Sequence, residues 1–291
     1  MIPIAFDYER PQSLEDAVRL AASAGDGAAI LAGGQSLLTG LKQRTKRPRL
    51  IIDIGAIAGL DKIEVDGDRL RIGAMARQAD IVSHQAVIQH LPLLAEIAAV
   101  AADPMVRRRG TLVGALCEAD PGGDWLAGAL ALDARLVGIG ASGDWDVPLS
   151  VLYGDASRSA WHPGDVAAAV VFPLPTRRPW TRYAKVKHPA IGWSIASVAA
   201  VLDVAADGRC QVAAIAVSGA VTRPQRLQRL EAELLGRRLA DTAREAGAVG
   251  TALAELSFRG DYYASESYRA ARLAVLLRRT LIDCATATQG S

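Results

Sequence analysis

Cysteine is scarce in this sequence, and its scarcity excludes several kinds of site. Among 291 residues there are three cysteines, Cys117, Cys210 and Cys284, which lie far apart and form no CxxC pair. Neither an iron–sulfur cluster nor a structural zinc site can be built from so few thiols, and the odd number argues against a disulfide framework. The four histidines show no HxH or HExxH spacing. We therefore predict no metal site on this chain.

An excess of charge of one sign is also missing. The 33 Lys and Arg residues nearly balance the 31 Asp and Glu residues, which leaves a formal net charge of +2. Nucleic-acid-binding proteins usually carry a strong basic excess or a basic stripe, whereas the basic runs at 42–49 and 107–109 are short. We predict no nucleic-acid partner. Arg107–Arg109 belongs either to a solvated loop or to a surface that faces a partner subunit.

Long hydrophobic runs are absent as well. Nearly uncharged runs such as Ile191–Leu202 fall short of the roughly 18 apolar residues that cross a bilayer. Met1–Arg10 contains Asp7 and Glu9 and lacks the basic start and apolar stretch of a signal or transit peptide. These features predict a cytoplasmic protein without membrane insertion.

The remaining composition is typical of a globular protein. Hydrophobic residues make up 51% of the chain and charged residues 22%, and this length favours two domains. Pro173, Pro175 and Pro179 interrupt both helix and sheet patterns, so we expect a domain boundary there. Beyond it, Ser194–Val204 and Gln211–Ser218 are typical of two strands.

Helical patterns dominate the C-terminal part. The segment Glu266–Cys284 is amphipathic, with Tyr268 and four leucines on one face. Arg269 and three further arginines occupy the opposite, polar face. This spacing predicts a helix that buries Tyr268 and exposes Arg269.

A glycine loop is the first candidate for chemistry. Ala28–Ala32 reads as a short buried strand that runs directly into Gly33-Gly34-Gln35-Ser36, and a helical turn follows. Consecutive glycines let the backbone approach an anion and point several N–H groups at it, and a diphosphate fits such a loop. An ordinary glycine turn explains the same residues equally well. The spacing matches neither GxGxxG nor GxxxxGK[ST], which disfavours a Rossmann or kinase-type nucleotide site.

The second candidate is the segment Thr111–Asp124. It offers a hydroxyl, small residues and three carboxylates that could accept hydrogen bonds from ribose hydroxyls. A solvated acidic loop that caps a helix starting at Trp125 explains it as well. We interpret Cys117 as a small buried residue rather than a nucleophile, because no histidine lies near it in the sequence.

Several of these segments, in order and spacing, resemble one family. The chain is similar to the FAD-binding medium subunits of molybdenum hydroxylases, of the carbon monoxide dehydrogenase and xanthine dehydrogenase type. The resemblance extends from Phe6–Pro11 to Ser265–Arg279. It is carried by Ala32-Gly33-Gly34-Gln35-Ser36, Ile72-Gly73-Ala74-Met75, Asp103 to Arg107 before Gly110 to Gly114, and Ala119-Asp120-Pro121 before Asp124.

The resemblance implies an α+β fold. It implies a two-part FAD-binding domain of the vanillyl-alcohol oxidase-like type at residues 1–175, with subdomains at about 1–56 and 57–175. A smaller α+β domain at 176–291 would follow.

The resemblance also implies roles for matching residues. The glycine loop would hold the FAD diphosphate, Asp124 would bind the adenosine ribose, Lys185 would lie near the cofactor, and Trp193 would lie near the flavin ring. No residue of this chain would be catalytic. The residues implied in cofactor binding are Leu31, Ala32, Gly33, Gly34, Gln35, Ser36, Ala74, Met75, Thr111, Gly114, Ala115, Glu118, Asp124, Lys185 and Trp193.

The chain departs from the family pattern at four positions. Relatives usually read AGGHS, TIGG followed by Asn, and Asn before Ala-Asp-Pro, where this chain has Gln35, Val113, Ala115 and Glu118. Val113 adds a side chain where relatives have glycine. Gln35 offers no imidazole to attach a flavin, so FAD is expected to be noncovalent.

The resemblance finally implies partners. Because this chain lacks cluster ligands, the molybdopterin and the [2Fe–2S] clusters would reside on a large and a small partner subunit, in a heterotrimer that pairs into a dimer of heterotrimers. The chain would carry electrons from the clusters to a terminal acceptor. A stand-alone flavin oxidoreductase and an FAD-less scaffold subunit remain alternatives.

Overall fold

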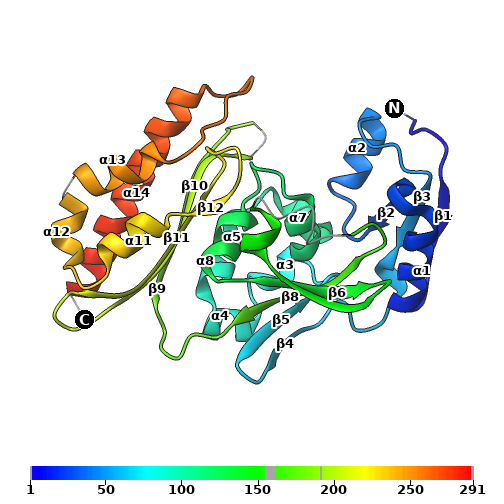
Figure 1. The fold of residues 1–291 in the computed structure, drawn as a ribbon, viewed down its shortest axis with the longest axis horizontal. Helices are drawn as coiled ribbons and strands as arrows, with labels where there is room; N and C mark the ends of the chain where they lie inside the picture. Colours follow the sequence, from blue (N-terminus) through cyan, green and yellow to red (C-terminus); the bar gives the residue numbers. More distant parts are fainter. Residues whose placement is uncertain (1, 155–161, 191, 245, 290–291) are drawn as a thin grey trace. The chain divides into compact units, whose positions relative to one another are not determined.

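The structure is a computed structural model that describes residues 2–154, 162–190, 192–244 and 246–289 (Figure 1). The chain forms two compact units, each built from several segments. The first unit comprises 1–86, 103–118 and 134–173, and the second comprises 87–102, 119–133 and 174–291. The division between domains expected near residue 175 stays a prediction, since two helical segments from the N-terminal half group with the second unit.

The first unit begins with a three-stranded parallel sheet in the order β1-β3-β2. Its strands are β1 (Asp7–Glu9), β2 (Ala28–Leu31) and β3 (Leu50–Asp53). Helix α1 (Leu14–Ala24) packs on it and buries Ala17, Val18 and Ala21. The Ser13 hydroxyl accepts a hydrogen bond from the Asp16 backbone N–H at 3.1 Å and so caps this helix. Helix α2 (Leu37–Gln43) follows β2.

The other sheet of the first unit is antiparallel, in the order β4-β5-β8-β6-β7 (Figure 1). Helix α1 also packs on this sheet, and so does α7. The strands are β4 (Ile63–Asp66), β5 (Arg69–Gly73), β6 (Arg135–Gly140), β7 (Gly143–Pro148) and β8 (Val166–Pro173), and the short helices are α3 (Gln78–Ile81), α6 (Pro104–Arg109), α7 (Leu112–Glu118) and α9 (Leu149–Leu152). The division between the two units falls within helix α4 (Gln85–His90), between Ala86 and Val87.

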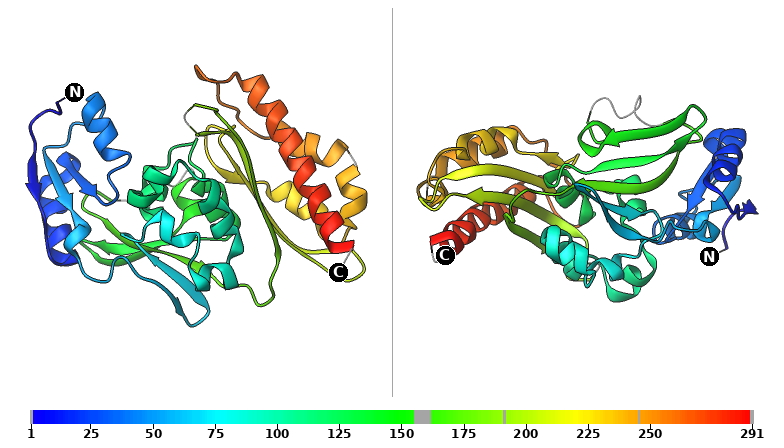
Figure 2. Two further views of the ribbon diagram at one scale, coloured as in Figure 1. Left: turned by 180° about the vertical axis from the view of Figure 1, so that it is seen from behind. Right: turned by 90° about the horizontal axis from the view of Figure 1, so that it is seen from below.

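The second unit contains a four-stranded antiparallel sheet in the order β12-β11-β10-β9. Figure 2 shows its yellow-green to yellow strands and the orange to red helices of the same unit from two further sides. Helices cover both faces, which explains why β10 is a nearly continuous apolar run with little polar alternation. The strands are β9 (Trp180–Lys187), β10 (Ser194–Val204), β11 (Cys210–Ser218) and β12 (Gln225–Arg226), and the helices are α5 (Pro92–Val100), α8 (Trp125–Ala131), α11 (Gln228–Leu234), α12 (Leu239–Arg244), α13 (Ala246–Ala254) and α14 (Glu266–Gln289).

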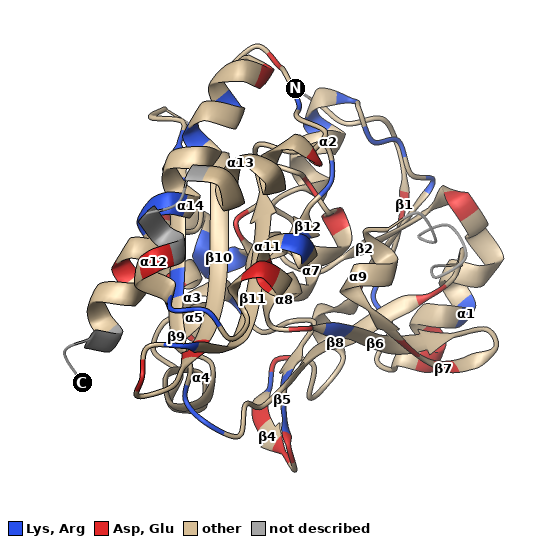
Figure 3. Ribbon diagram, turned by 60° about the vertical axis from the view of Figure 1, so that its left-hand side comes forward, with Lys and Arg blue, Asp and Glu red and all other residues tan. Residues whose placement is uncertain are grey.

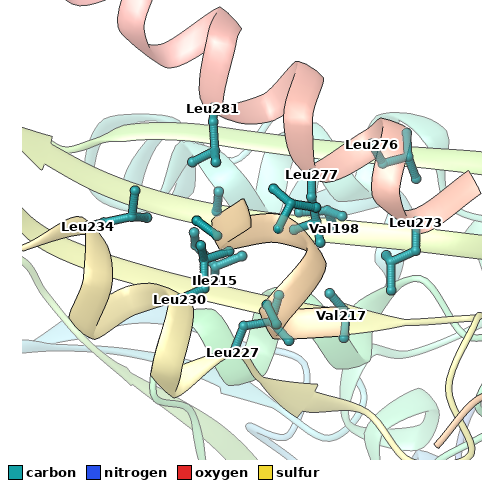
Figure 4. Close-up of a cluster of buried hydrophobic side chains, with 14 of the residues drawn as sticks. Val198, Ile215, Val217, Leu227, Leu230, Leu234, Leu273, Leu276, Leu277 and Leu281 are labelled. Atoms are coloured by element: carbon teal, nitrogen blue, oxygen red, sulfur yellow. The ribbon is translucent and has the colours of Figure 1, made fainter. Parts of the chain in front are cut away.

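The core of the second unit lies between this sheet and helices α11 to α14 (Figure 4). Leu273, Leu277 and Leu281 of α14 point onto Val198 and neighbouring side chains of the sheet. The predicted leucine face of the last helix is therefore confirmed. Two details were wrong: Tyr268 is 41% exposed and Arg269 only 2% exposed.

Candidate functional site

The glycine loop between β2 and α2 has a backbone that ordinary residues rarely adopt. Gly34 has a φ of 75°, in the left-handed region that favours glycine. A Cβ atom on Gly33 would lie 2.5 Å from the carbonyl oxygen of Arg109 and 2.8 Å from the Cα atom of Gly110. Gly33 therefore allows two backbone segments to meet that are far apart in sequence.

This loop also leaves donors free. Among the described residues, no acceptor is assigned to the backbone N–H groups of Gly34, Gln35, Ser36 and Leu37, and the first internal bond of α2 is that from Leu38 N–H to Gly34 oxygen at 3.0 Å. Such a row of free N–H groups in a glycine turn favours binding of an anion.

The second wall is the segment from Gly110 to Glu118. Sequence patterns suggested a loop here, but Leu112–Glu118 is the helix α7. Thr111 starts it, since its hydroxyl accepts a hydrogen bond from Gly114 N–H at 3.1 Å. The buried side chain of Gln78 fixes the turn before α7, because its amide donates to Thr111 oxygen at 3.2 Å.

A cavity of about 600 Å³ lies between these walls, entirely within the first unit. Small-molecule and cofactor sites typically measure about 300–1,000 Å³. Most of the predicted cofactor residues line it, namely Ala32, Gly33, Gly34, Gln35, Ser36, Ala74, Thr111, Gly114, Ala115 and Glu118. Leu31 and Met75 belong to the same unit and adjoin lining residues, but they are not part of the lining.

Some lining residues were not predicted. Lys46 reaches the cavity from the segment after α2 and pairs with Glu118. Gln78 and the turn His162–Asp165 also line the cavity. Val113, where relatives were expected to have glycine, lies against the cavity with its side chain 2% exposed. No local motif marks Lys46 or Gln78, because their roles depend on partners more than 30 residues away.

Cys117 also opens onto the cavity. Its side chain is exposed to that space, so the expectation that it is a buried residue was wrong. Desolvation by the surrounding protein atoms, and next the charge of Glu118, raise the pKa of its thiol to about 12. The thiol stays protonated near neutral pH, in agreement with the interpretation that it is not a nucleophile.

Three of the residues predicted to bind the cofactor, Asp124, Lys185 and Trp193, lie in the second unit instead. Lys185 donates to Asp124 at 2.8 Å and to the Gly192 oxygen at 3.2 Å. Asp124 also accepts hydrogen bonds from the Tyr183 hydroxyl at 2.9 Å and from Ala102 N–H at 3.2 Å. Its carboxylate does not cap helix α8. Burial, and next the Asp124 charge, raise the pKa of Tyr183 well above its ordinary value, so its hydroxyl remains a donor.

Trp193 is the third of these residues. It lies next to the start of β10 with a side chain that is 51% exposed, and its backbone oxygen accepts a hydrogen bond from His188 N–H at 2.8 Å. The structure therefore brings Asp124 and Lys185 into one buried network and leaves Trp193 on the surface of its unit.

The described residues contain no cluster of three or more His, Cys, Asp or Glu side chains that could hold a metal ion. Within the same ranges, every helix is too short or too polar to span a bilayer. Arg107–Arg109 forms the last turn of α6 rather than a loop. Basic and acidic residues are interspersed along the elements visible in Figure 3.

The fold and the site define a class. Free N–H groups on a glycine turn that lines a cavity together with a second backbone segment, in a unit of helices and strands, are features of a protein that holds a phosphate-containing cofactor. Comparison with known proteins makes this class specific. Residues 4–175 match the model of the FAD-binding domain in molybdopterin dehydrogenase, and residues 181–284 match the CO dehydrogenase flavoprotein C-terminal domain.

Relatives match over nearly their whole length. The nicotine 6-hydroxylase medium subunit of Paenarthrobacter nicotinovorans is 34% identical, over 98% of this chain and 99% of the relative. The carbon monoxide dehydrogenase medium chain of Afipia carboxidovorans is 33% identical over 97% of both chains. A solved carbon monoxide dehydrogenase from Hydrogenophaga pseudoflava superimposes with a TM-score of 0.92 at 32% identity, over 99% of both chains.

The chain belongs to the FAD-binding medium subunits of the molybdenum hydroxylases, and it is an FAD-dependent oxidoreductase subunit. The family resemblance and the α+β fold expected from the sequence are thereby confirmed, with an FAD-binding domain followed by a smaller C-terminal domain.

Proposed function

We propose that this chain holds FAD noncovalently in the cavity of the first unit and carries electrons from [2Fe–2S] clusters of a partner subunit to a terminal acceptor. The observation that supports this most directly is the row of free N–H groups at Gly34–Leu37, which lines the same cavity as residues of the segment Thr111 to Glu118. Bound FAD supplies the redox chemistry, because it accepts and releases electrons singly or in pairs.

The residues of this chain bind and orient the FAD. The glycine loop donates to the diphosphate, and Gly33 keeps the two walls close together. Gln35 carries no group that attaches a flavin, and the protonated thiol of Cys117 is a poor nucleophile. FAD is therefore expected to leave the protein on denaturation.

The roles predicted for Asp124, Lys185 and Trp193 stay part of the proposal. A carboxylate has about four acceptor positions, and Asp124 uses three of them for Tyr183, Lys185 and Ala102. One position is left for a ribose hydroxyl. Lys185 supplies the opposite charge to the buried Asp124 carboxylate.

The lack of cysteine ligands for a [2Fe–2S] cluster implies that this chain works with partner subunits. The three cysteines cannot build a [2Fe–2S] cluster, and the relatives are named medium chains or medium subunits. We therefore propose a large molybdopterin-binding subunit and a small [2Fe–2S] subunit, joined with this chain in a heterotrimer that forms a dimer of heterotrimers in the cytoplasm. Co-expression with such chains, followed by light scattering of the purified complex, tests the stoichiometry.

Cofactor binding is tested with a matched pair of glycine substitutions. Gly34→Asp adds a negative charge and a side chain at a φ of 75°, directly at the free N–H groups. Gly67→Asp makes the same change at a φ of 59° in the β4–β5 turn, where a Cβ meets open space. We expect the Gly34 variant to be purified colourless and the Gly67 variant to keep the flavin spectrum. Colourless wild-type protein that takes up no added FAD would refute the proposal.

Electron transfer is tested in the complex. Substrate of the complex should reduce the flavin only when the [2Fe–2S] subunit is present, as followed by stopped-flow absorbance. Rapid reduction of the isolated chain by a small substrate would instead support a stand-alone flavin oxidoreductase.

A further inference from the structure

Lys46 and Glu118 form an ion pair that joins the two walls of the cavity. The Lys46 ammonium lies 2.5 Å from Oε2 of Glu118, and both residues line the cavity. Lys46 comes from the segment after α2, whereas Glu118 ends α7, 72 residues later. The two side chains are 40% and 31% exposed, so the pair is partly desolvated.

The local backbone builds the position of Lys46. Helix α2 ends at Gln43, and the next residue, Arg44, has a φ of 62° that reverses the direction of the chain. The backbone N–H groups of Thr45 and Lys46 then donate to the Gly40 oxygen at 3.0 and 3.2 Å. A Cβ on Gly40 would lie 2.8 Å from Cγ of Lys46, so the absence of a side chain at Gly40 makes room for the lysine stem.

The charged side chains that line the cavity indicate what this ion pair does. Among the described residues that line it, Asp26, Glu118 and Asp165 carry carboxylates, and Lys46 is the one Lys or Arg. Three carboxylates and one ammonium give these side chains a formal charge of −2, and loss of Lys46 would make it −3, so that the lining would repel a negative diphosphate more strongly. Opposite charges in a partly desolvated cavity interact more strongly than on an open surface.

We propose that Lys46 determines how strongly this cavity holds FAD, because it offsets the carboxylate of Glu118 and so makes the cavity acceptable to a diphosphate. This inference rests on the proposed binding of FAD in the same cavity. It makes Lys46 a positioning and affinity residue that acts through Glu118.

The test is a double-mutant cycle on FAD affinity. Wild-type protein and the variants Lys46→Met, Glu118→Gln and Lys46→Met/Glu118→Gln are freed of flavin and titrated with FAD, with flavin fluorescence as the readout. Lys62→Met removes one exposed positive charge of the same unit away from the cavity and serves as the control. Circular dichroism confirms that each variant is folded.

Lys46→Met is expected to weaken FAD binding about three- to tenfold, since it exposes the Glu118 charge. The double variant should return to within about twofold of the wild-type affinity, and Lys62→Met should leave it unchanged. The loss caused by Lys46→Met should shrink as salt is raised, because salt screens charge interactions.

Two results would overturn the inference. One is an unchanged affinity in Lys46→Met. The other is a double variant as weak as Lys46→Met, since Lys46 would then act without Glu118. Failure of the proposed function looks different, because wild-type protein itself would then bind no FAD.

Discussion

The Lys185 ammonium lies 2.8 Å from Oδ1 of Asp124, and each side chain is less than one-tenth exposed. Both oxygens of the carboxylate accept hydrogen bonds, Oδ1 from Lys185 and the Tyr183 hydroxyl and Oδ2 from Ala102 N–H. Removing one partner of a buried ion pair strongly destabilises the fold, because the remaining charge stays buried without its counter-charge.

Lys185→Met is therefore expected to destabilise the protein by about 3–5 kcal/mol. The double variant Asp124→Asn/Lys185→Met should lose less, because it leaves no unpaired charge. Urea unfolding followed by circular dichroism measures both. Lys187→Met, an exposed lysine of the same strand, is the control and should change little. Equal stability of Lys185→Met and wild type would contradict the role of the pair.

Asp261 should make the stability of the second unit depend on pH in the acid range. Burial by itself raises the pKa of its carboxyl, but hydrogen bonds from Arg269, Arg259 and two backbone N–H groups outweigh this and hold the pKa far below its ordinary value. A group whose pKa is lowered by folding stabilises the protein above its unfolded pKa, about 4, and loses this contribution as the pH falls further.

Asp261→Asn should thus be less stable than wild type at pH 6, and its stability should fall less steeply below about pH 4. Thermal unfolding between pH 6 and 2.5 measures the difference. Asp241→Asn, at an exposed position of α12, provides the control. Parallel pH profiles for wild type and Asp261→Asn would rule out this role.

Local signals explain which parts of the fold could be predicted. The strand before Gly33 and the two strands predicted at Ser194–Val204 and Gln211–Ser218 depend on residues within a few positions of one another. The glycine loop was recognisable for the same reason, because its φ requirement is met by Gly34 itself.

Arg269 shows why other features could not be predicted. On a helical wheel it belongs to the polar face of α14, yet its guanidinium is buried and donates to the backbone oxygens of Ile195 and Gly219, both at 2.8 Å. These acceptors come from segments 74 and 50 residues away. The position of Lys46 at the cavity could not be predicted for the same reason, since its partner Glu118 is distant in sequence. The periodicity of a helix shows which of its own faces is apolar, and it carries no information about partners from distant segments.

Cys117 should react slowly although it is exposed to the cavity. With a pKa of about 12, its thiolate fraction at pH 8 is about a thousandfold below that of a thiol with a pKa near 9. Because a thiolate of higher pKa is also a better nucleophile, labelling with iodoacetamide at pH 8, followed by mass spectrometry, should be slower by about thirty- to sixtyfold in folded than in unfolded protein. The rate should rise with pH. Labelling of Cys117 at equal rates in folded and unfolded protein would contradict the raised pKa.

Gly33→Ala should separate the two walls of the cavity. The new Cβ would meet the carbonyl oxygen of Arg109 at 2.5 Å, and this backbone atom cannot rotate away as a side chain could. We expect a loss of about 1–3 kcal/mol in the free energy of unfolding, as for other overpacked positions, together with weaker FAD binding. Gly250→Ala is the control, because a Cβ there meets nothing within 4 Å and alanine favours the helix. Urea unfolding and FAD titration of both variants provide the comparison, and a Gly33 variant that matches wild type in both would show that the walls do not depend on this close approach.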